Sequence, residues 1–114
     1  MNLEEIRDYC LTFKGVGESI KWDNHLCFEV GEKMFTILNL DGVPSISLKV
    51  TPEEYEELLG SEQFISAPYL GRYKWVYMAD YNTISKTDLF KYIRQSYELI
   101  RMKLPKKVRD QLQD

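Results

Sequence analysis

The segment from Tyr69 to Trp75 carries the clearest binding chemistry in this chain of 114 residues. It reads Tyr-Leu-Gly-Arg-Tyr-Lys-Trp, so two cations, Arg72 and Lys74, are interleaved with three aromatic rings. Cations contact phosphates and aromatic rings stack on bases, so this combination is typical of a nucleic-acid-binding surface. We expect Trp75 to enter the core, and Arg72 and Lys74 to face solvent. For Tyr73, a place in the core and a place at the surface are equally expected.

The net charge of −3 hides an uneven distribution. Residues 1–85 hold seven basic and fourteen acidic side chains, and the acidic Asp110 and Asp114 lie near the end. Between them lie two acidic side chains and eight basic ones: Lys86, Lys91, Arg94, Arg101, Lys103, Lys106, Lys107 and Arg109. Local potential steers an anionic partner more than net charge does, so this segment is a candidate binding surface. The alternative is a solvated helix face whose cations complement a helix C-terminus.

No nucleophile with a nearby base is found, so we expect no enzyme. His25 is the only histidine and lies two residues from Cys27, but nothing local supplies the orienting group and oxyanion site that a Cys-His pair needs. No glycine-rich phosphate loop is present. Two cysteines form neither a disulfide framework nor a four-ligand zinc site, so Cys10 and Cys27 are expected to be buried, reduced thiols. No cofactor is expected.

Two groups of carboxylates offer metal binding as an alternative. Glu4, Glu5 and Asp8 share roughly one face of the expected first helix, and four glutamates lie within residues 53–57. Carboxylate clusters can hold hard cations or iron. Both groups begin helices, where the helix dipole favours acidic side chains, so capping and solvation also explain them.

Length and composition predict one globular domain over residues 1–114. Hydrophobic residues make up 44% of the chain and charged residues 29%, which is typical of a soluble domain. The apolar runs are too short for a transmembrane helix, and the first residues lack the basic and apolar regions of a signal peptide. The sequence therefore predicts a cytoplasmic protein that does not bind membranes.

The first half predicts a helix and three strands. Asn2 caps a helix that Gly15 and Gly17 end. Residues 26–30 and 33–40 predict a β-hairpin around Gly31-Glu32, a connection that suits a type II′ turn. Residues 45–50 alternate strictly, which indicates a half-buried strand with Ser45, Ser47 and Lys49 facing outward.

The second half predicts a short helix, one or two strands and a long helix. A capping box at residues 51–54 begins the short helix, and Gly60 ends it. Residues 64–67 and 75–78 are candidate strands joined by a turn or a projecting hairpin tip. Ser85 begins the longest helix, which Pro105 breaks or kinks. This order predicts an α+β domain: an antiparallel sheet of about four or five strands with the N- and C-terminal helices on one face.

Eight segments form an ordered pattern along the chain: Gly15-Val16, Val30 to Asp41, Ser45 to Lys49, Pro52 to Glu54, Ala67 to Tyr69, Trp75, Ser96 to Ile100, and Lys103 to Lys107. Together they resemble the MmcQ/YjbR family of small bacterial proteins. The resemblance covers nearly the whole chain. It implies a frataxin-like (CyaY-like) fold and DNA binding through two hairpin wings, by position the Gly31-Glu32 turn with Lys33 and residues 68–75. The family often has a histidine where Leu70 stands, which weakens any role that needs one there.

The leading hypothesis is a non-enzymatic DNA-binding protein with weak, salt-sensitive and largely non-specific affinity. Its candidate contact residues are Lys33, Arg72, Tyr73, Lys74, Lys103, Lys106, Lys107 and Arg109. One alternative is a protein-interaction or dimerisation module anchored by tyrosines and tryptophans, so either a monomer or a homodimer is open. The other is a weak, frataxin-like metal-binding protein that uses Glu4, Glu5 and Asp8.

Overall fold

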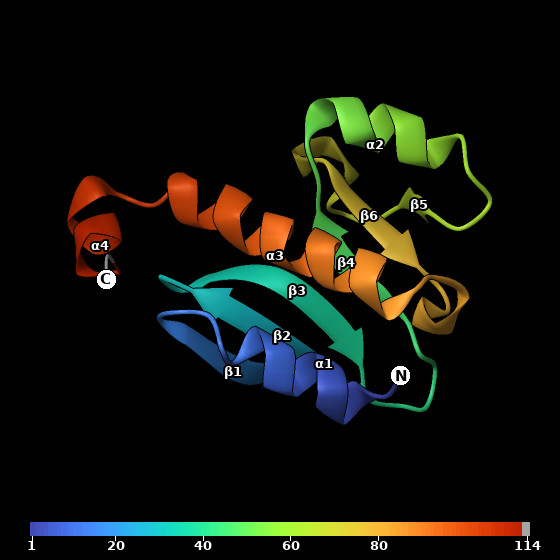
Figure 1. Ribbon diagram of the computed structural model, residues 1–114, viewed down its shortest axis with the longest axis horizontal. Coiled ribbons are helices and arrows are strands. Elements are labelled where there is room, and N and C mark those ends of the chain that lie inside the picture. Colours follow the sequence, from blue (N-terminus) through green and yellow to red (C-terminus); the bar gives the residue numbers. More distant parts are fainter. Residues whose placement is uncertain (113–114) are drawn as a thin grey trace.

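A single antiparallel sheet of six strands forms the centre of the computed structural model, which describes residues 1–112. The strand order is β1-β2-β3-β4-β6-β5, with α1 and α3 packed across one face (Figure 1). The strands are β1 (Val16–Lys21), β2 (His25–Val30), β3 (Lys33–Asn39), β4 (Ile46–Lys49), β5 (Ile65–Ser66) and β6 (Trp75–Met78). The helices are α1 (Leu3–Cys10), α2 (Pro52–Leu59), α3 (Lys86–Met102) and α4 (Lys106–Gln111), with 3-10 turns η1 (Gly71–Tyr73) and η2 (Tyr81–Thr83). The predicted α+β class is confirmed, with six strands in place of four or five.

Strand β1 is the element that the sequence analysis missed. Gly15 and Gly17 were expected only to end the first helix, but the chain pairs with β2 from Val16↔Val30 to Lys21↔His25. β1 is an edge strand, and Gly17, Glu18 and Ile20 are all exposed. An edge strand with little burial lacks the apolar alternation that identifies a strand from sequence.

The β2–β3 turn differs in type from the expected one. Gly31 and Glu32 both have positive φ, +55° and +67°, which defines a type I′ turn rather than type II′. Gly31 is also needed for space, because a Cβ there would lie 2.7 Å from Cδ1 of Leu104. The turn therefore packs beneath the C-terminal segment.

The main core lies between the sheet and the helices. Phe28, Phe35 and Leu48 from the sheet meet Leu89 and Ile93 of α3, all nearly inaccessible to solvent. The apolar side of α3 thus packs on the sheet. Within residues 1–112 no helix has both the length and the apolar content to cross a bilayer.

The opposite side of the sheet, here called the rear face, carries a second and smaller apolar cluster. Cys27, Ile37, Ala67 and Trp75 form its buried part. Residues 67–74, which leave β5 and pass through η1, fold back towards β6 by hydrogen bonds such as Ala67 N–H to the Trp75 carbonyl at 3.1 Å. This segment is therefore a compact turn, and Trp75 is buried as expected.

Candidate functional site

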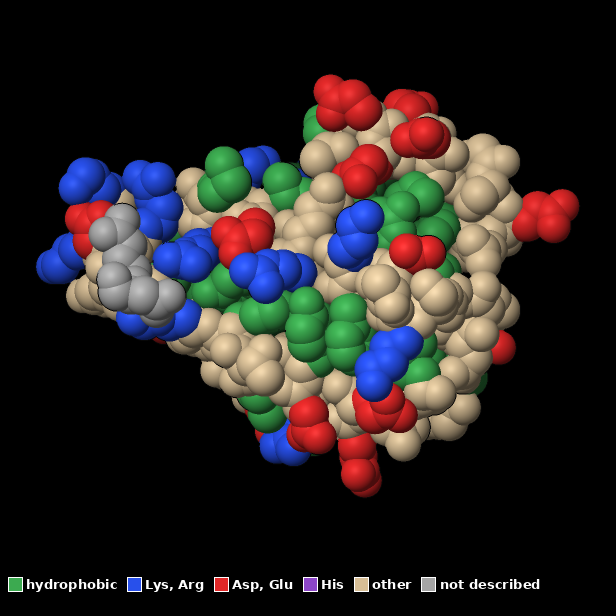
Figure 2. Space-filling view, viewed as in Figure 1, with side chains coloured by type: hydrophobic (Ala, Val, Ile, Leu, Met, Phe, Trp, Pro, Cys, Tyr) green, Lys and Arg blue, Asp and Glu red, His purple; other side chains and the backbone are tan. Residues whose placement is uncertain are grey.

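Three segments that are distant in sequence meet at one end of the molecule. Leu104 and Val108 lie against the β2–β3 turn at Gly31, and Lys49 at the end of β4 pairs with Trp75 at the start of β6. Basic side chains crowd the α4 end of this region (Figure 2). We call this surface the basic end and define it by Lys33, Lys49, Lys74, Lys103, Lys107 and Arg109.

A cluster of three lysines lies at the centre of the basic end. The pKa of Lys49 is lowered, first by burial and then by the positive charges of Lys103 and Lys74. These three lysines come from β4, the end of α3 and the start of β6. Among residues 1–112 none of them forms a salt bridge, so no carboxylate in this part of the chain pairs with the three lysines.

Lys49 is the member of the basic end that sequence analysis did not select. Strict alternation placed it on an outward strand face, but its side chain is buried, and its Nζ donates a hydrogen bond to the backbone carbonyl of Tyr73. The covering residues arrive from much later in the chain, so no local signal identifies them. Lys74 is also fixed, because its Nζ lies 4.8 Å from the centroid of the Tyr55 ring.

Arg72 and Tyr73 form an exposed pair beside this cluster. Nη2 of Arg72 donates a hydrogen bond to the Tyr73 hydroxyl at 2.6 Å, and its guanidinium carbon lies 4.8 Å from the ring centroid. Tyr73 is about half exposed, which places it at the surface. Both candidates are therefore accessible, as the predicted binding role requires.

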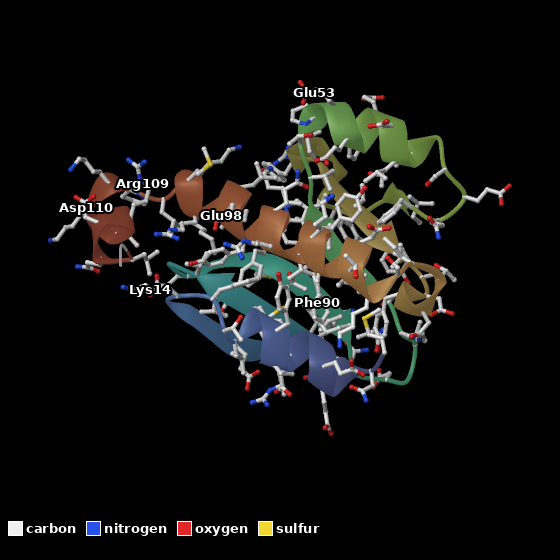
Figure 3. All side chains as sticks on the ribbon, in the orientation of Figure 1. Lys14, Glu53, Phe90, Glu98, Arg109 and Asp110 are labelled. Atoms are coloured by element: carbon white, nitrogen blue, oxygen red, sulfur yellow. The ribbon has the colours of Figure 1, made fainter. Side chains whose placement is uncertain are left out.

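Apolar anchors orient the cations of the C-terminal segment. Leu104 is buried and Val108 is half-buried against the Gly31 turn, so Lys103, Lys107 and Arg109 are left exposed. Lys106 differs, because its Nζ pairs with the Asp110 carboxylate at 3.0 Å. Figure 3 shows Arg109 and Asp110 together on α4, remote from Glu53 on α2. Lys106 is therefore a weaker phosphate-contact candidate than its neighbours.

The first half of α3 does not extend this basic surface. Lys86 pairs with Glu5 of α1 at 2.8 Å. Lys91 lines a cavity of about 400 Å³ between α2 and α3 together with Glu54 and Asp88. These carboxylates, after burial itself, raise the pKa of Tyr92 in the same cavity. Carboxylates at a cavity disfavour a phosphate, so this cavity is a poorer candidate for phosphate binding than the basic end.

The other predicted chemistries find little geometric support. Glu5 is engaged by Lys86, and the described residues contain no group of three or more His, Cys, Asp and Glu side chains placed to hold a metal. Burial raises the pKa of Cys10 to about 12 and that of Cys27 to about 11. Both thiols are therefore protonated at neutral pH, and neither is an activated nucleophile.

Comparison with known proteins identifies the family. The YjbR family model matches residues 11–99. The chain belongs to the YjbR family. The match ends before α4, so the basic residues Lys103, Lys107 and Arg109 of this YjbR protein lie beyond the matched region. A search of curated proteins finds no match.

Two solved structures resemble this YjbR protein in fold. One, a Deinococcus radiodurans protein with the family domain DUF419, has a TM-score of 0.87 and 27% identity, covering 97% of this chain and 87% of its own. The other, from Pseudomonas syringae, has a TM-score of 0.70 and 19% identity, covering 87% of this chain and 98% of its own. These similarities agree with the predicted family, whereas the frataxin-like fold stays a prediction.

Proposed function

We propose that this YjbR protein binds DNA without catalysis, by placing phosphates on the basic end. The observation that supports this most is the lysine cluster, in which Lys49 is buried beside Lys74 and Lys103. Assembling like charges lowers stability unless a counter-charge relieves the repulsion. A phosphate is such a counter-charge, and Lys107 and Arg109 extend the surface for further phosphates.

The chemistry of the surface points to weak and largely sequence-independent binding. Lysines contact phosphates as point charges and release counterions, so affinity falls steeply with salt. Base-edge readout needs Arg, Asn or Gln side chains presented to a groove by a helix or ribbon. Of these, the described basic end offers Arg109, on the short helix α4. On the sequence arguments given above, we propose that this binding takes place in the cytoplasm.

Fluorescence anisotropy with a short labelled duplex, titrated at several salt concentrations, tests the proposal. Lys74→Gln and Lys103→Gln are each expected to reduce the slope of log affinity against log salt by about 0.9, the value for one phosphate contact. Lys86→Gln is the matched control, because that lysine is already paired with Glu5, and it should leave the slope unchanged.

Two results would contradict the proposal. One is the absence of binding at micromolar protein and low salt. The other is an equal loss of affinity in Lys86→Gln and Lys103→Gln, which would show that only net charge matters. Light scattering on the same samples tests the alternative of a dimerisation module, because a homodimer doubles the scattering mass without DNA.

A further inference from the structure

The rear face holds an open cavity of about 520 Å³. Its floor is formed by Ile37, Ser47 and Tyr77, which lie opposite one another on the adjacent strands β3, β4 and β6. Trp22 from the β1–β2 turn and residues 67–70 after β5 form its walls. This volume is within the range of pockets that bind small molecules.

Two aromatic rings stand exposed at the rim of this cavity. Trp22 is 62% exposed and Tyr69 is 99% exposed. Both have positive φ, +53° and +67°, a region that bulky side chains rarely adopt. Because both rings are exposed, the energy gained by burying a ring does not offset the strain of this backbone conformation. Rings held open at both walls are suited to stacking on a flat ligand.

His25 also lines the cavity, on the same side as Trp22. Its ring meets the Trp22 ring edge-on, with the two centroids 5.7 Å apart. This contact holds the Trp22 ring in place at the rim, where a flat ligand can stack on it.

The basic end begins close to this cavity. Ser47 of the floor and Lys49 of the lysine cluster are two residues apart on β4, so they share a face and lie about 7 Å apart along the strand. Tyr69 immediately precedes the segment that leads through η1 to Lys74. A ligand seated in the cavity thus has phosphate-binding cations within reach.

From these four features we propose that the rear-face cavity binds a planar nitrogenous ring with the chemistry of a nucleobase, while an attached phosphate chain lies on the basic end. The part played by the basic end rests on the proposed function. Two sources supply this chemistry: an unpaired base in a single strand, and a free mononucleotide. A base within an intact duplex is not available to the cavity, because it is stacked and paired.

Tryptophan fluorescence and anisotropy test the assignment with deoxyadenosine monophosphate, an oligo-deoxyadenosine strand and a duplex of equal length. Trp22 is one of two tryptophans and the other, Trp75, is buried, so a ring stacking on Trp22 should quench the exposed signal. Tyr69→Asn removes the second ring and suits the left-handed backbone, which asparagine tolerates. We expect it to weaken single-strand binding roughly 5- to 150-fold, which is the fold-change that corresponds to the stacking energy of one base on an aromatic ring. Duplex binding should be unchanged.

Ile20→Ala is the matched control. Ile20 is 64% exposed, but it lies opposite Leu26 and so projects from the other face of the sheet. The Ile20→Ala variant should bind the mononucleotide and the single strand with the same affinity as the unmodified protein. If the mononucleotide quenches the tryptophan fluorescence and Tyr69→Asn abolishes this quenching, the cavity assignment is supported and a free nucleotide is identified as a source. Quenching by the strand alone would support it with an unpaired base as the source.

The outcomes separate this inference from the proposed function. If Lys74→Gln weakens strand binding and Tyr69→Asn does not, the cavity assignment is overturned and phosphate binding stands. If neither the strand nor the duplex binds, the proposed function fails. The fluorescence titration with the mononucleotide then tests the cavity assignment by itself. Quenching that depends on Tyr69 then supports the site, and the absence of quenching overturns it.

Discussion

The side-chain hydroxyl of Ser96 on α3 accepts a hydrogen bond from the backbone N–H of Lys49 on β4, at 2.9 Å. The same hydroxyl donates one to the carbonyl of Phe35 on β3, at 2.6 Å. Pairing between β3 and β4 reaches only from Leu38↔Ile46 to Thr36↔Leu48. Ser96 therefore joins the two strands where they separate, and it fixes the backbone of the buried lysine in the basic end.

Ser96→Ala should lower the free energy of unfolding by about 1–3 kcal/mol, because it leaves a buried N–H and a buried carbonyl unpaired. Chemical denaturation monitored by circular dichroism measures the change. Ser61→Ala serves as the control, since its hydroxyl bonds to the Leu58 carbonyl at an exposed helix end. A loss no greater for Ser96→Ala than for Ser61→Ala would contradict the bridging role.

Gly31→Ala should destabilise the packing of the C-terminal segment. The new Cβ would lie 2.7 Å from Leu104 Cδ1 and 3.2 Å from Val108 Cγ1, at a φ of +55°. Overpacking and left-handed backbone strain together predict a loss of about 2–4 kcal/mol, seen as a lower thermal midpoint. Gly42→Ala isolates the backbone contribution, because its φ is +86° but no atom of residues 1–112 lies within 4 Å of the added Cβ. If Gly31→Ala and Gly42→Ala lost equal stability, the predicted clash of the new Cβ with Leu104 and Val108 would be refuted.

Lys103→Gln should raise stability at low salt while it weakens DNA binding. Removing one like charge near Lys49 relieves repulsion, and the gain should be about 0.5 kcal/mol or less and vanish at high salt. Because the pKa of folded Lys49 lies below its ordinary 10.5, the gain is present below the folded pKa and disappears as pH rises past 10.5. Lys107→Gln provides the comparison in denaturation at matched pH, because Lys107 is not among the charges that lower the pKa of Lys49. If Lys103→Gln left the free energy of unfolding unchanged at low salt, this would contradict the repulsion between Lys103 and Lys49.

Alkaline pH should destabilise the protein through the buried thiol of Cys10. Its pKa is about 12 in the folded state against 9.0 for an unperturbed thiol, so above pH 9 the unfolded state loses a proton that the folded state keeps. Stability then falls by up to about 1.4 kcal/mol per pH unit between 9 and 12. Cys10→Ala should show a shallower pH dependence in denaturation. Parallel curves for the two proteins would rule out this contribution.

The sequence predicts well those features that depend on nearby residues. The Thr51–Glu54 capping box and the Ser85 cap are present, and Pro105 separates α3 from α4. Each depends on side chains that meet the backbone within three residues. The apolar stripe of α3 is equally local, because helical spacing alone decides which residues face the sheet.

Features that depend on distant segments could not be predicted in the same way. Lys49 resembles an outward strand residue until the Tyr73 carbonyl, from a later segment, covers it. The rear-face cavity draws residues from β2, β3, β4 and β6 and from two turns, so no stretch of sequence contains its pattern. Composition singles out Arg72, Tyr73, Lys74 and Lys103 as candidates, and of these Arg72, Tyr73 and Lys103 are exposed whereas Lys74 is half-buried. Composition does not indicate that Lys74 and Lys103 share a buried neighbour, Lys49.

The order of the strands also bears on when the protein can bind a partner. The first four strands are joined by successive local connections, whereas β6 must enter between β4 and β5 before Lys49 meets Lys74. Such non-local pairing carries a loop-closure cost and slows folding. A chain with only the first hairpins formed carries the acidic residues of its N-terminal part but no assembled lysine cluster. If the basic end binds DNA as proposed, affinity for polyanions should emerge late in folding, and partly folded molecules should be repelled by DNA.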